Sequence, residues 1–81
     1  MSKVYKDPAA TALCDQIRWL YNINPDGGWI ARPHHGNKEI RIGHPDYGKD
    51  ENITRQVDTL FYAINTLNLC EKVGYTLVIT S

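Results

Sequence analysis

The sequence predicts a single small α+β domain in which two helices cover one face of a three-stranded antiparallel or mixed sheet. Three observations support this fold class. Two segments repeat apolar residues at spacings of three and four, two short strand-like runs lie between them, and a β-branched run follows the second segment. We expect the order helix, strand, strand, helix, strand in one compact domain spanning residues 1–81.

The first helix is predicted to begin at Asp7-Pro8, because Asp caps free backbone N–H groups and Pro fits the first turn. The turn formers of residues 24–28 are expected to end it. Its apolar stripe consists of Ala10, Leu13, Cys14, Ile17, Leu20 and Tyr21.

A hairpin is predicted next, with strands at residues 29–35 and 38–43. Gly36-Asn37 fits a two-residue turn with Gly at the position of positive φ. Pro33 cannot donate a ladder hydrogen bond, so its strand is expected to lie at a sheet edge or to contain a bulge there. Alternation then turns one set of side chains towards the core: Trp29, Ala31, Pro33, Ile40 and Ile42.

The second helix is expected to begin at a cap on Asp50 and to stop at Gly74. Its apolar stripe consists of Ile53, Val57, Leu60, Phe61, Ile64 and Leu67. The run from Tyr75 to Thr80 is the strongest strand signal in the chain. It carries no charge that would block pairing, so we predict an uncovered sheet edge there.

Composition restricts the class of protein. Nine Lys and Arg balance nine Asp and Glu. A disordered tail or a strongly electrostatic nucleic-acid binder normally has a far less even balance of charge, so the composition argues against both classes. Cys14 and Cys70 belong to no CxxC array, and we expect two reduced, buried thiols inside the helices. No apolar run approaches the ~20 residues of a membrane span, and the start lacks a signal-peptide pattern, so we expect a cytoplasmic protein without a membrane partner.

The histidines raise two chemical hypotheses. His34, His35 and His44 lie near Asp46, but neighbouring strand residues point to opposite faces, so we expect water-exposed histidines, no metal site and no cofactor. The predicted register sets His34 opposite Glu39, beside two arginines, which would suit acid–base chemistry on a phosphodiester. An exposed cross-strand pair is the commoner arrangement, and no nucleophile or phosphate-loop motif occurs, so the sequence favours a protein that is not an enzyme.

The segment Pro33-His34-His35-Gly36-Asn37-Lys38-Glu39-Ile40 resembles a short stretch of HicA-type toxins, which are small ribonucleases with a double-stranded-RNA-binding-like fold. The resemblance covers these eight residues. The Gly-Ser-His-His segment that supplies the family's catalytic histidine has no counterpart, so no catalytic residue is assigned. A small HicA-like ribonuclease is one alternative function.

Outward-facing aromatic residues favour a different function. Trp19 and Tyr62 lie opposite the apolar stripes of their helices, and these residue types are enriched in binding hot spots. Trp19 is alternatively covered by Val4 and Tyr5. With Val78 on the final strand, the two aromatics predict a small non-enzymatic protein-interaction module.

We expect this module to be accessory, regulatory or inhibitory, of phage or mobile-element type, and bound to a protein partner or to a second copy as a homodimer. The alternative is a nucleic-acid or nucleotide binder. It would use the exposed sheet face, where Arg32 and Arg41 are predicted to oppose each other near His34.

Overall fold

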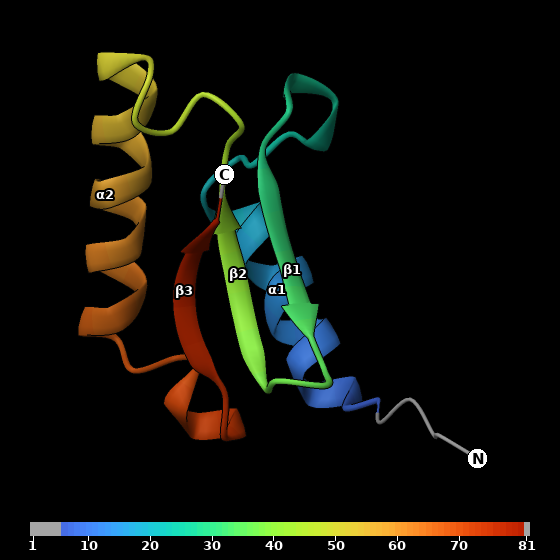
Figure 1. The fold of residues 1–81 in the computed structure, drawn as a ribbon. Helices are drawn as coiled ribbons and strands as arrows, with labels where there is room; N and C mark the ends of the chain where they lie inside the picture. The colour runs from blue at the N-terminus through green and yellow to red at the C-terminus, as the bar shows by residue number, and fades with distance from the viewer. Residues whose placement is uncertain (1–5, 81) are drawn as a thin grey trace.

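The computed structural model describes residues 6–80, so Val4 and Tyr5 lie outside the described residues. The elements are listed in chain order: α1 (Pro8–Leu20), the short 3-10 helix η1 (Pro25–Gly27), β1 (Ile30–His34), β2 (Glu39–Gly43), α2 (Glu51–Thr66), the 3-10 helix η2 (Glu71–Val73) and β3 (Thr76–Thr80). Figure 1 shows the three strands side by side with α1 behind them.

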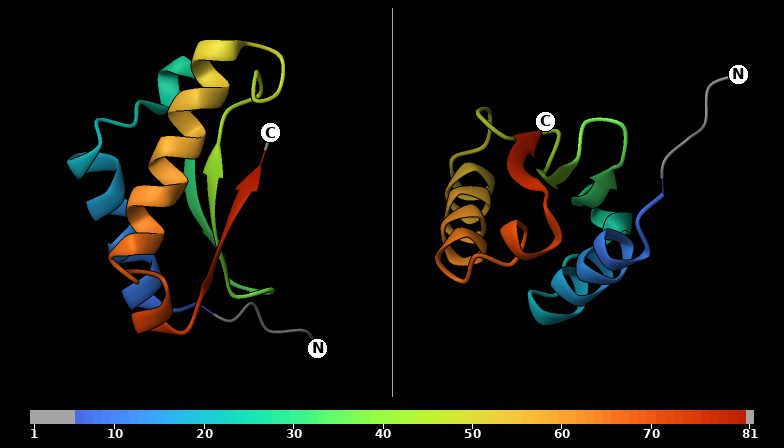
Figure 2. Two further views of the ribbon diagram at one scale, coloured as in Figure 1. Left: turned by 90° about the vertical axis from the view of Figure 1, so that its left-hand side faces the viewer. Right: turned by 90° about the horizontal axis from the view of Figure 1, so that it is seen from below.

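The three strands form one mixed sheet in the order β1-β2-β3. β1 and β2 are an antiparallel hairpin, whereas β2 and β3 are parallel and are connected through α2. Both helices lie on the same face of the sheet, which leaves the other face without a helix (Figure 2). The predicted fold class is confirmed, and the sheet is of the mixed kind.

The core lies between the helix layer and the inner face of the sheet. Its largest fully buried side chains are Ile17, Ile40, Ile42, Ile64, Val57 and Cys14. Leu13 and Leu60 are also buried, as expected, and so is Leu77. Trp29 and Phe61, which were expected in the core, are only partly buried, and so is Ile79.

The hairpin register is the predicted one, with Arg32 opposite Arg41 and His34 opposite Glu39. The turn differs in its backbone. Lys38, with a φ of 52°, adopts the left-handed conformation rather than Gly36, and its N–H donates to the His35 carbonyl. This is the four-residue type of hairpin loop, in which a tight turn is followed by one left-handed residue.

α1 begins as predicted, because Asp7 accepts a hydrogen bond from the Ala9 N–H. It ends earlier than expected. Asn22 takes a left-handed φ of 53°, and the Ile23 N–H donates to the Arg18 carbonyl, which is the pattern of a Schellman cap. The expectation that Leu20 belongs to the core is wrong: Leu20 is the last residue of α1 and is 47% exposed, while Ile23 is buried beyond the cap.

α2 starts at its predicted cap, where the Asp50 carboxylate accepts from the Ile53 N–H at 3.1 Å. It ends at Thr66 rather than near Gly74, because Asn68 is left-handed at a φ of 54°. Cys70 therefore lies outside α2, before η2, although it is buried as expected.

Within residues 6–80 we find no helix with the length and apolar character needed to cross a membrane.

Candidate functional site

The sheet has a free edge along β3. The Thr76 N–H donates to the Lys38 carbonyl at 2.9 Å, so the backbone groups of Thr76 point towards β2. Backbone groups along a strand alternate in direction, so those of Val78 also point to β2, and those of Leu77 and Ile79 point away from the sheet. Among residues 6–80 no further strand pairs with β3. Figure 2 (left) looks onto this edge and shows no helix crossing in front of it.

The same alternation fixes the direction of the backbone groups in the hairpin. Since the Lys38 carbonyl faces β3, Arg41 faces β1 and exchanges both ladder hydrogen bonds with Arg32. The two residues beside Arg32, Ala31 and Pro33, then direct their backbone groups to the outer edge of β1.

This outer edge of β1 is blocked. Pro33 has no N–H to offer, and the Ala31 carbonyl already accepts a hydrogen bond from the Arg18 guanidinium. Arg18 is itself held by an ion pair with Asp15 on the same helix. The two edges of the sheet thus differ: β1 is closed to a further strand, and β3 is open.

The face of the sheet without helices carries one neutral ion pair and one further cation. Glu39 accepts from the Arg41 Nε at 3.0 Å and from its Nη2 at 2.9 Å. Glu39 is therefore the anion that offsets one of the two opposed arginines. Arg32 is exposed and forms no ion pair with the described residues. Val78 lies beside Arg41 on the same face, which brings two of the predicted site groups together.

Two of the three histidines are half-buried and separately engaged. The Nδ1 atom of His34 accepts from the Asn37 N–H at 3.3 Å. The Nδ1 atom of His35 lies 3.0 Å from the Tyr75 hydroxyl and accepts from the Asp7 N–H. Among residues 6–80 no cluster of three metal-ligating side chains occurs.

The third histidine, His44, is buried at 7% exposure, so the expectation of water-exposed histidines is wrong for it. Its Nε2 lies 2.9 Å from the Gly27 carbonyl, and its Nδ1 accepts from the Asp46 N–H at 3.0 Å. These partners set the hydrogen-bonding roles of the two ring nitrogens, with Nε2 as the donor and Nδ1 as the acceptor. The ring also contacts the Trp29 ring edge-on, with 5.1 Å between the two centroids. Through its contact with the Gly27 carbonyl, His44 connects η1 to the end of β2.

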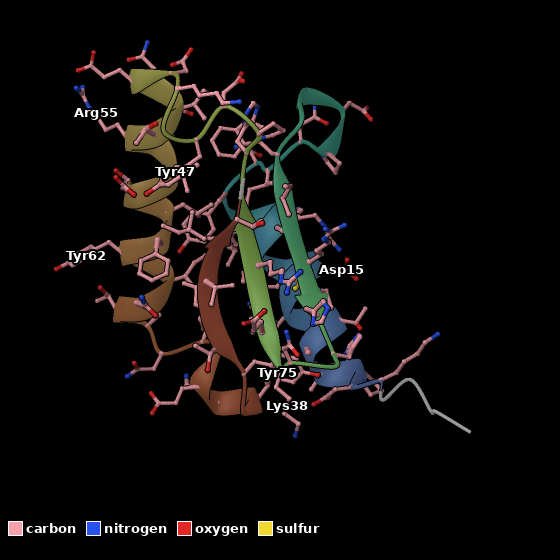
Figure 3. All side chains as sticks on the ribbon, viewed as in Figure 1. Asp15, Lys38, Tyr47, Arg55, Tyr62 and Tyr75 are labelled. Atoms are coloured by element: carbon pink, nitrogen blue, oxygen red, sulfur yellow. The ribbon has the colours of Figure 1, made fainter. Side chains whose placement is uncertain are left out.

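The outward aromatics are exposed as predicted, Trp19 at 78% and Tyr62 at 74%. They lie on different flanks of the helix layer, because α1 packs on β1 whereas α2 packs on β3 and β2. Tyr62 projects from α2 on the side where β3 is the outermost strand (Figure 3).

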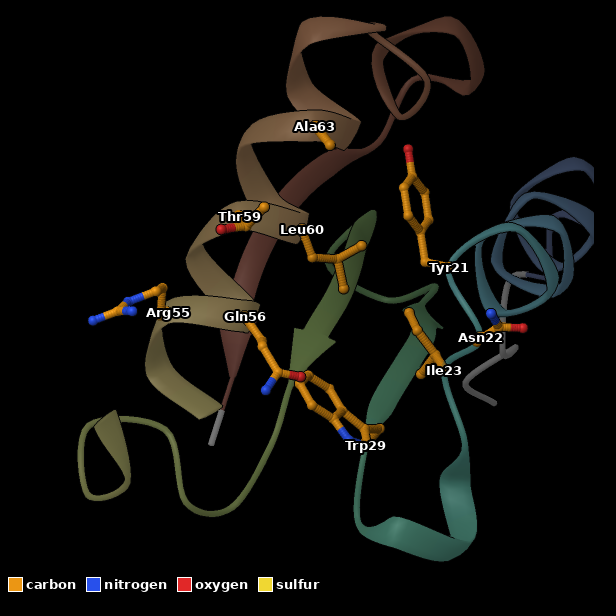
Figure 4. Close-up of a pocket in the computed structure, with 9 residues that line it drawn as sticks. All are labelled: Tyr21, Asn22, Ile23, Trp29, Arg55, Gln56, Thr59, Leu60 and Ala63. Carbon is orange, nitrogen blue, oxygen red and sulfur yellow. The ribbon is translucent and has the colours of Figure 1, made fainter. Parts of the chain in front are cut away.

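Several grooves border α2; one of about 550 Å³ lies over the start of the helix and the loop before it, and two others lie closer to the sheet. The first of these two, of about 390 Å³, lies between α2 and the end of α1, where Tyr21 and Ile23 face Leu60 and Ala63 while Arg55 points away (Figure 4). The second, of about 410 Å³, lies beside the first half of β3 and is lined by Asn65, Asn68, Cys70, Glu71, Tyr75, Thr76 and Leu77.

Both cysteine thiols are buried and have raised pKa values. Burial raises the pKa of the Cys14 thiol to about 12 and that of the Cys70 thiol to about 11. A thiol is nucleophilic only as the thiolate, so neither residue serves as a nucleophile near neutral pH.

No protein-family model matches this chain, and neither a curated protein nor a solved structure matches it. The candidate site therefore rests on geometry. The sequence identified Val78 and the run around it, but it did not identify Leu77 and Ile79 as the residues with outward backbone groups. That assignment needs the parallel pairing of β2 with β3, which has no local signal.

Proposed function

We propose that this protein is a small non-enzymatic interaction module that acts by strand addition: a strand of a protein partner pairs with the free edge of β3. The observation that carries the proposal is the difference between the two edges of the sheet. Pro33 and Arg18 close the β1 edge, whereas Leu77 and Ile79 leave N–H and C=O groups unpaired by any described strand.

The chemistry of β3 supports the same function. Its five residues, Thr-Leu-Val-Ile-Thr, carry no charge, no Pro and no Gly, and charge and Pro are the usual means of protecting an edge. Main-chain hydrogen bonds would supply affinity, and the groove beside Thr76 and Leu77 would receive alternate side chains of the added strand.

The test uses two substitutions at one residue. Ile79→Pro removes an outward N–H, whereas Ile79→Ala shortens the side chain further than Pro does and keeps that N–H. We expect both proteins to fold. Ile79→Pro should lose at least about fivefold in affinity for the partner strand, and Ile79→Ala should lose little, since each tenfold is ~1.4 kcal/mol and leaving the partner's carbonyl unpaired costs ~1–3 kcal/mol.

A third variant checks the assignment of backbone direction. Val78→Pro removes an N–H that points to β2, so it should destabilise the fold itself. Binding can be followed by amide hydrogen exchange, because the Leu77 and Ile79 amides should gain protection only in the complex. If Ile79→Pro bound as the parent does, with those amides still exchanging fast, strand addition at β3 would be excluded.

One observation favours a second candidate, a nucleic-acid or nucleotide binder. Arg32 is exposed on the face without helices and forms no ion pair with residues 6–80. A phosphate contact there would be lost on Arg32→Ala and would weaken with added salt. Binding of mixed RNA at two salt concentrations, with Arg32→Ala and the parent, tests it.

A further inference from the structure

We infer that the strand added to β3 is β3 of a second copy of this chain, so that two subunits form one continuous six-stranded sheet. This inference rests on the proposed function and names its partner. It starts from the directions of the backbone groups, because these limit the registers in which two β3 strands can pair.

In an antiparallel pair, residues that exchange hydrogen bonds must both point to the shared edge. On β3 these are Leu77 and Ile79. Pairing Leu77 with the partner's Ile79 lets both residues use their outward backbone groups. The two-fold symmetry generates a second, identical pair between Ile79 and the partner's Leu77. This register places the two-fold axis at Val78, which then faces the partner's Val78, and it aligns Thr76 with the partner's Thr80. It also pairs all five residues of each strand.

The facing residues are compatible with themselves. Thr–Thr and β-branched pairs are favourable across strands, and no like charges are set opposite each other. The charged residues nearest to β3 on the open face are Arg41 and Glu39, both one strand away, and they form an ion pair. The two copies of Arg41 would be three strand spacings apart, about 14 Å, which exceeds the screening length of ~8 Å at physiological salt.

The blocked edge argues for closure at two subunits. Each chain has one open edge, along β3, and one closed edge, along β1. A symmetric pairing of the open edges consumes both and leaves Pro33 and Arg18 at the two ends of the enlarged sheet. The contact is therefore isologous and does not propagate into a fibre.

α2 adds a second contact on the same side. Tyr62 is 74% exposed and projects from α2 on the β3 side of the molecule (Figure 3). A second subunit paired along β3 would bring its own α2 to the same face of the enlarged sheet as this residue. Trp19 is equally exposed but stands on α1, which packs on β1, so it lies on the flank that the dimer leaves free.

Crosslinking through one introduced cysteine, with the native Cys14 and Cys70 buried, tests the register. Val78→Cys sets two cysteines opposite each other in a non-hydrogen-bonded pair, with Cα atoms ~4.5 Å apart, within disulfide range. Thr76→Cys is the matched control, because its two copies would be about 14 Å apart. We expect a covalent dimer under mild oxidation for Val78→Cys, none for Thr76→Cys alone, and a crosslink when Thr76→Cys is mixed with Thr80→Cys.

Sedimentation of the full chain tests the dimer without crosslinks. The parent and Trp19→Ala should sediment as dimers at micromolar concentration. Tyr62→Ala should raise the dissociation constant at least tenfold, and Ile79→Pro, but not Ile79→Ala, should give monomers. Efficient crosslinking of Thr76→Cys alone would overturn the register.

A parent that remains monomeric at millimolar concentration would overturn the inference. The proposed function, strand addition at β3, is tested separately in that case. If Ile79→Pro then lost a foreign partner strand that Ile79→Ala retained, strand addition would stand and only the identity of the partner would change.

Discussion

At the scale of single residues, Gly43 shows how closely β2 and β3 approach. A Cβ atom on Gly43 would lie 1.7 Å from the Thr80 carbonyl oxygen, a backbone atom that cannot rotate away. Glycine is required because the Thr80 backbone of the neighbouring strand β3 occupies the space that a Cβ atom would need. The last pair of the parallel ladder depends on the missing side chain.

We therefore expect Gly43→Ala to lower the free energy of unfolding by about 1–3 kcal/mol, the usual cost of inserting a group into a filled space. Gly36→Ala is the control, since a Cβ there meets only the His34 ring at an ordinary 3.6 Å. That variant should stay within about 0.5 kcal/mol of the parent in urea denaturation. Equal stabilities for the two variants would contradict the close approach.

The two thiols give a residue-scale prediction about pH. Both pKa values lie above the ordinary 9.0, at about 12 for Cys14 and about 11 for Cys70, because burial disfavours the thiolate. In the unfolded chain the thiols ionise at lower pH. The stability gained by burying the neutral thiols is therefore fully present below pH 9, and it is lost as the pH rises towards the pKa values of the folded protein.

Stability should consequently fall above pH 9, and a Cys70→Ala variant should show a smaller fall. At pH 8, thiol labelling of the native protein should be slow and should accelerate only with denaturant. Fast labelling of Cys14 in the native state would show that the buried face of α1 is misassigned.

At the scale of elements, local signals predicted the starts of the helices and the hairpin register. Asp7 and Asp50 act on their own helices, and the spacing of the hairpin runs fixes which residues face each other. The helix ends could not be predicted equally well. Asn22 and Asn68 adopt the left-handed conformation ahead of the stronger turn formers that follow them.

The pairing of β3 could not be predicted either. Its neighbour and direction depend on α2 crossing the sheet, a contact between distant segments. The residues of the candidate edge could therefore be predicted from the sequence, but not which of their backbone groups are free.

The corrected end of α1 yields a test at this scale. Ile64→Ala, at a fully buried position of α2, should cost roughly 2–5 kcal/mol and unfold a marginal domain of this size. Leu20→Ala should cost less than about 1 kcal/mol, because its side chain is 47% exposed at the last residue of α1. Thermal melts of both variants separate a helix that ends at Leu20 from one that continues and buries it.

At the scale of the whole molecule, the balance of charge separates the two candidate functions. Nine basic and nine acidic residues leave no net charge, and β3 itself is uncharged. Association through β3, as proposed, would therefore be carried by backbone hydrogen bonds and apolar contact, neither of which is strongly screened by salt. A phosphate-binding face would behave differently, because each neutralised phosphate releases counterions.

We expect the dissociation constant of the dimer to change by less than about threefold between roughly 50 and 200 mM salt. Arg32→Ala should leave it unchanged, since Arg32 lies on β1, two strands from the paired edge. Sedimentation at the two salt concentrations, with the parent, Arg32→Ala and Ile79→Pro, provides the measurement. Steeply salt-dependent binding of RNA that is lost on Arg32→Ala and retained in Ile79→Pro would instead assign the function to the open sheet face, where one cation remains unpaired among the described residues.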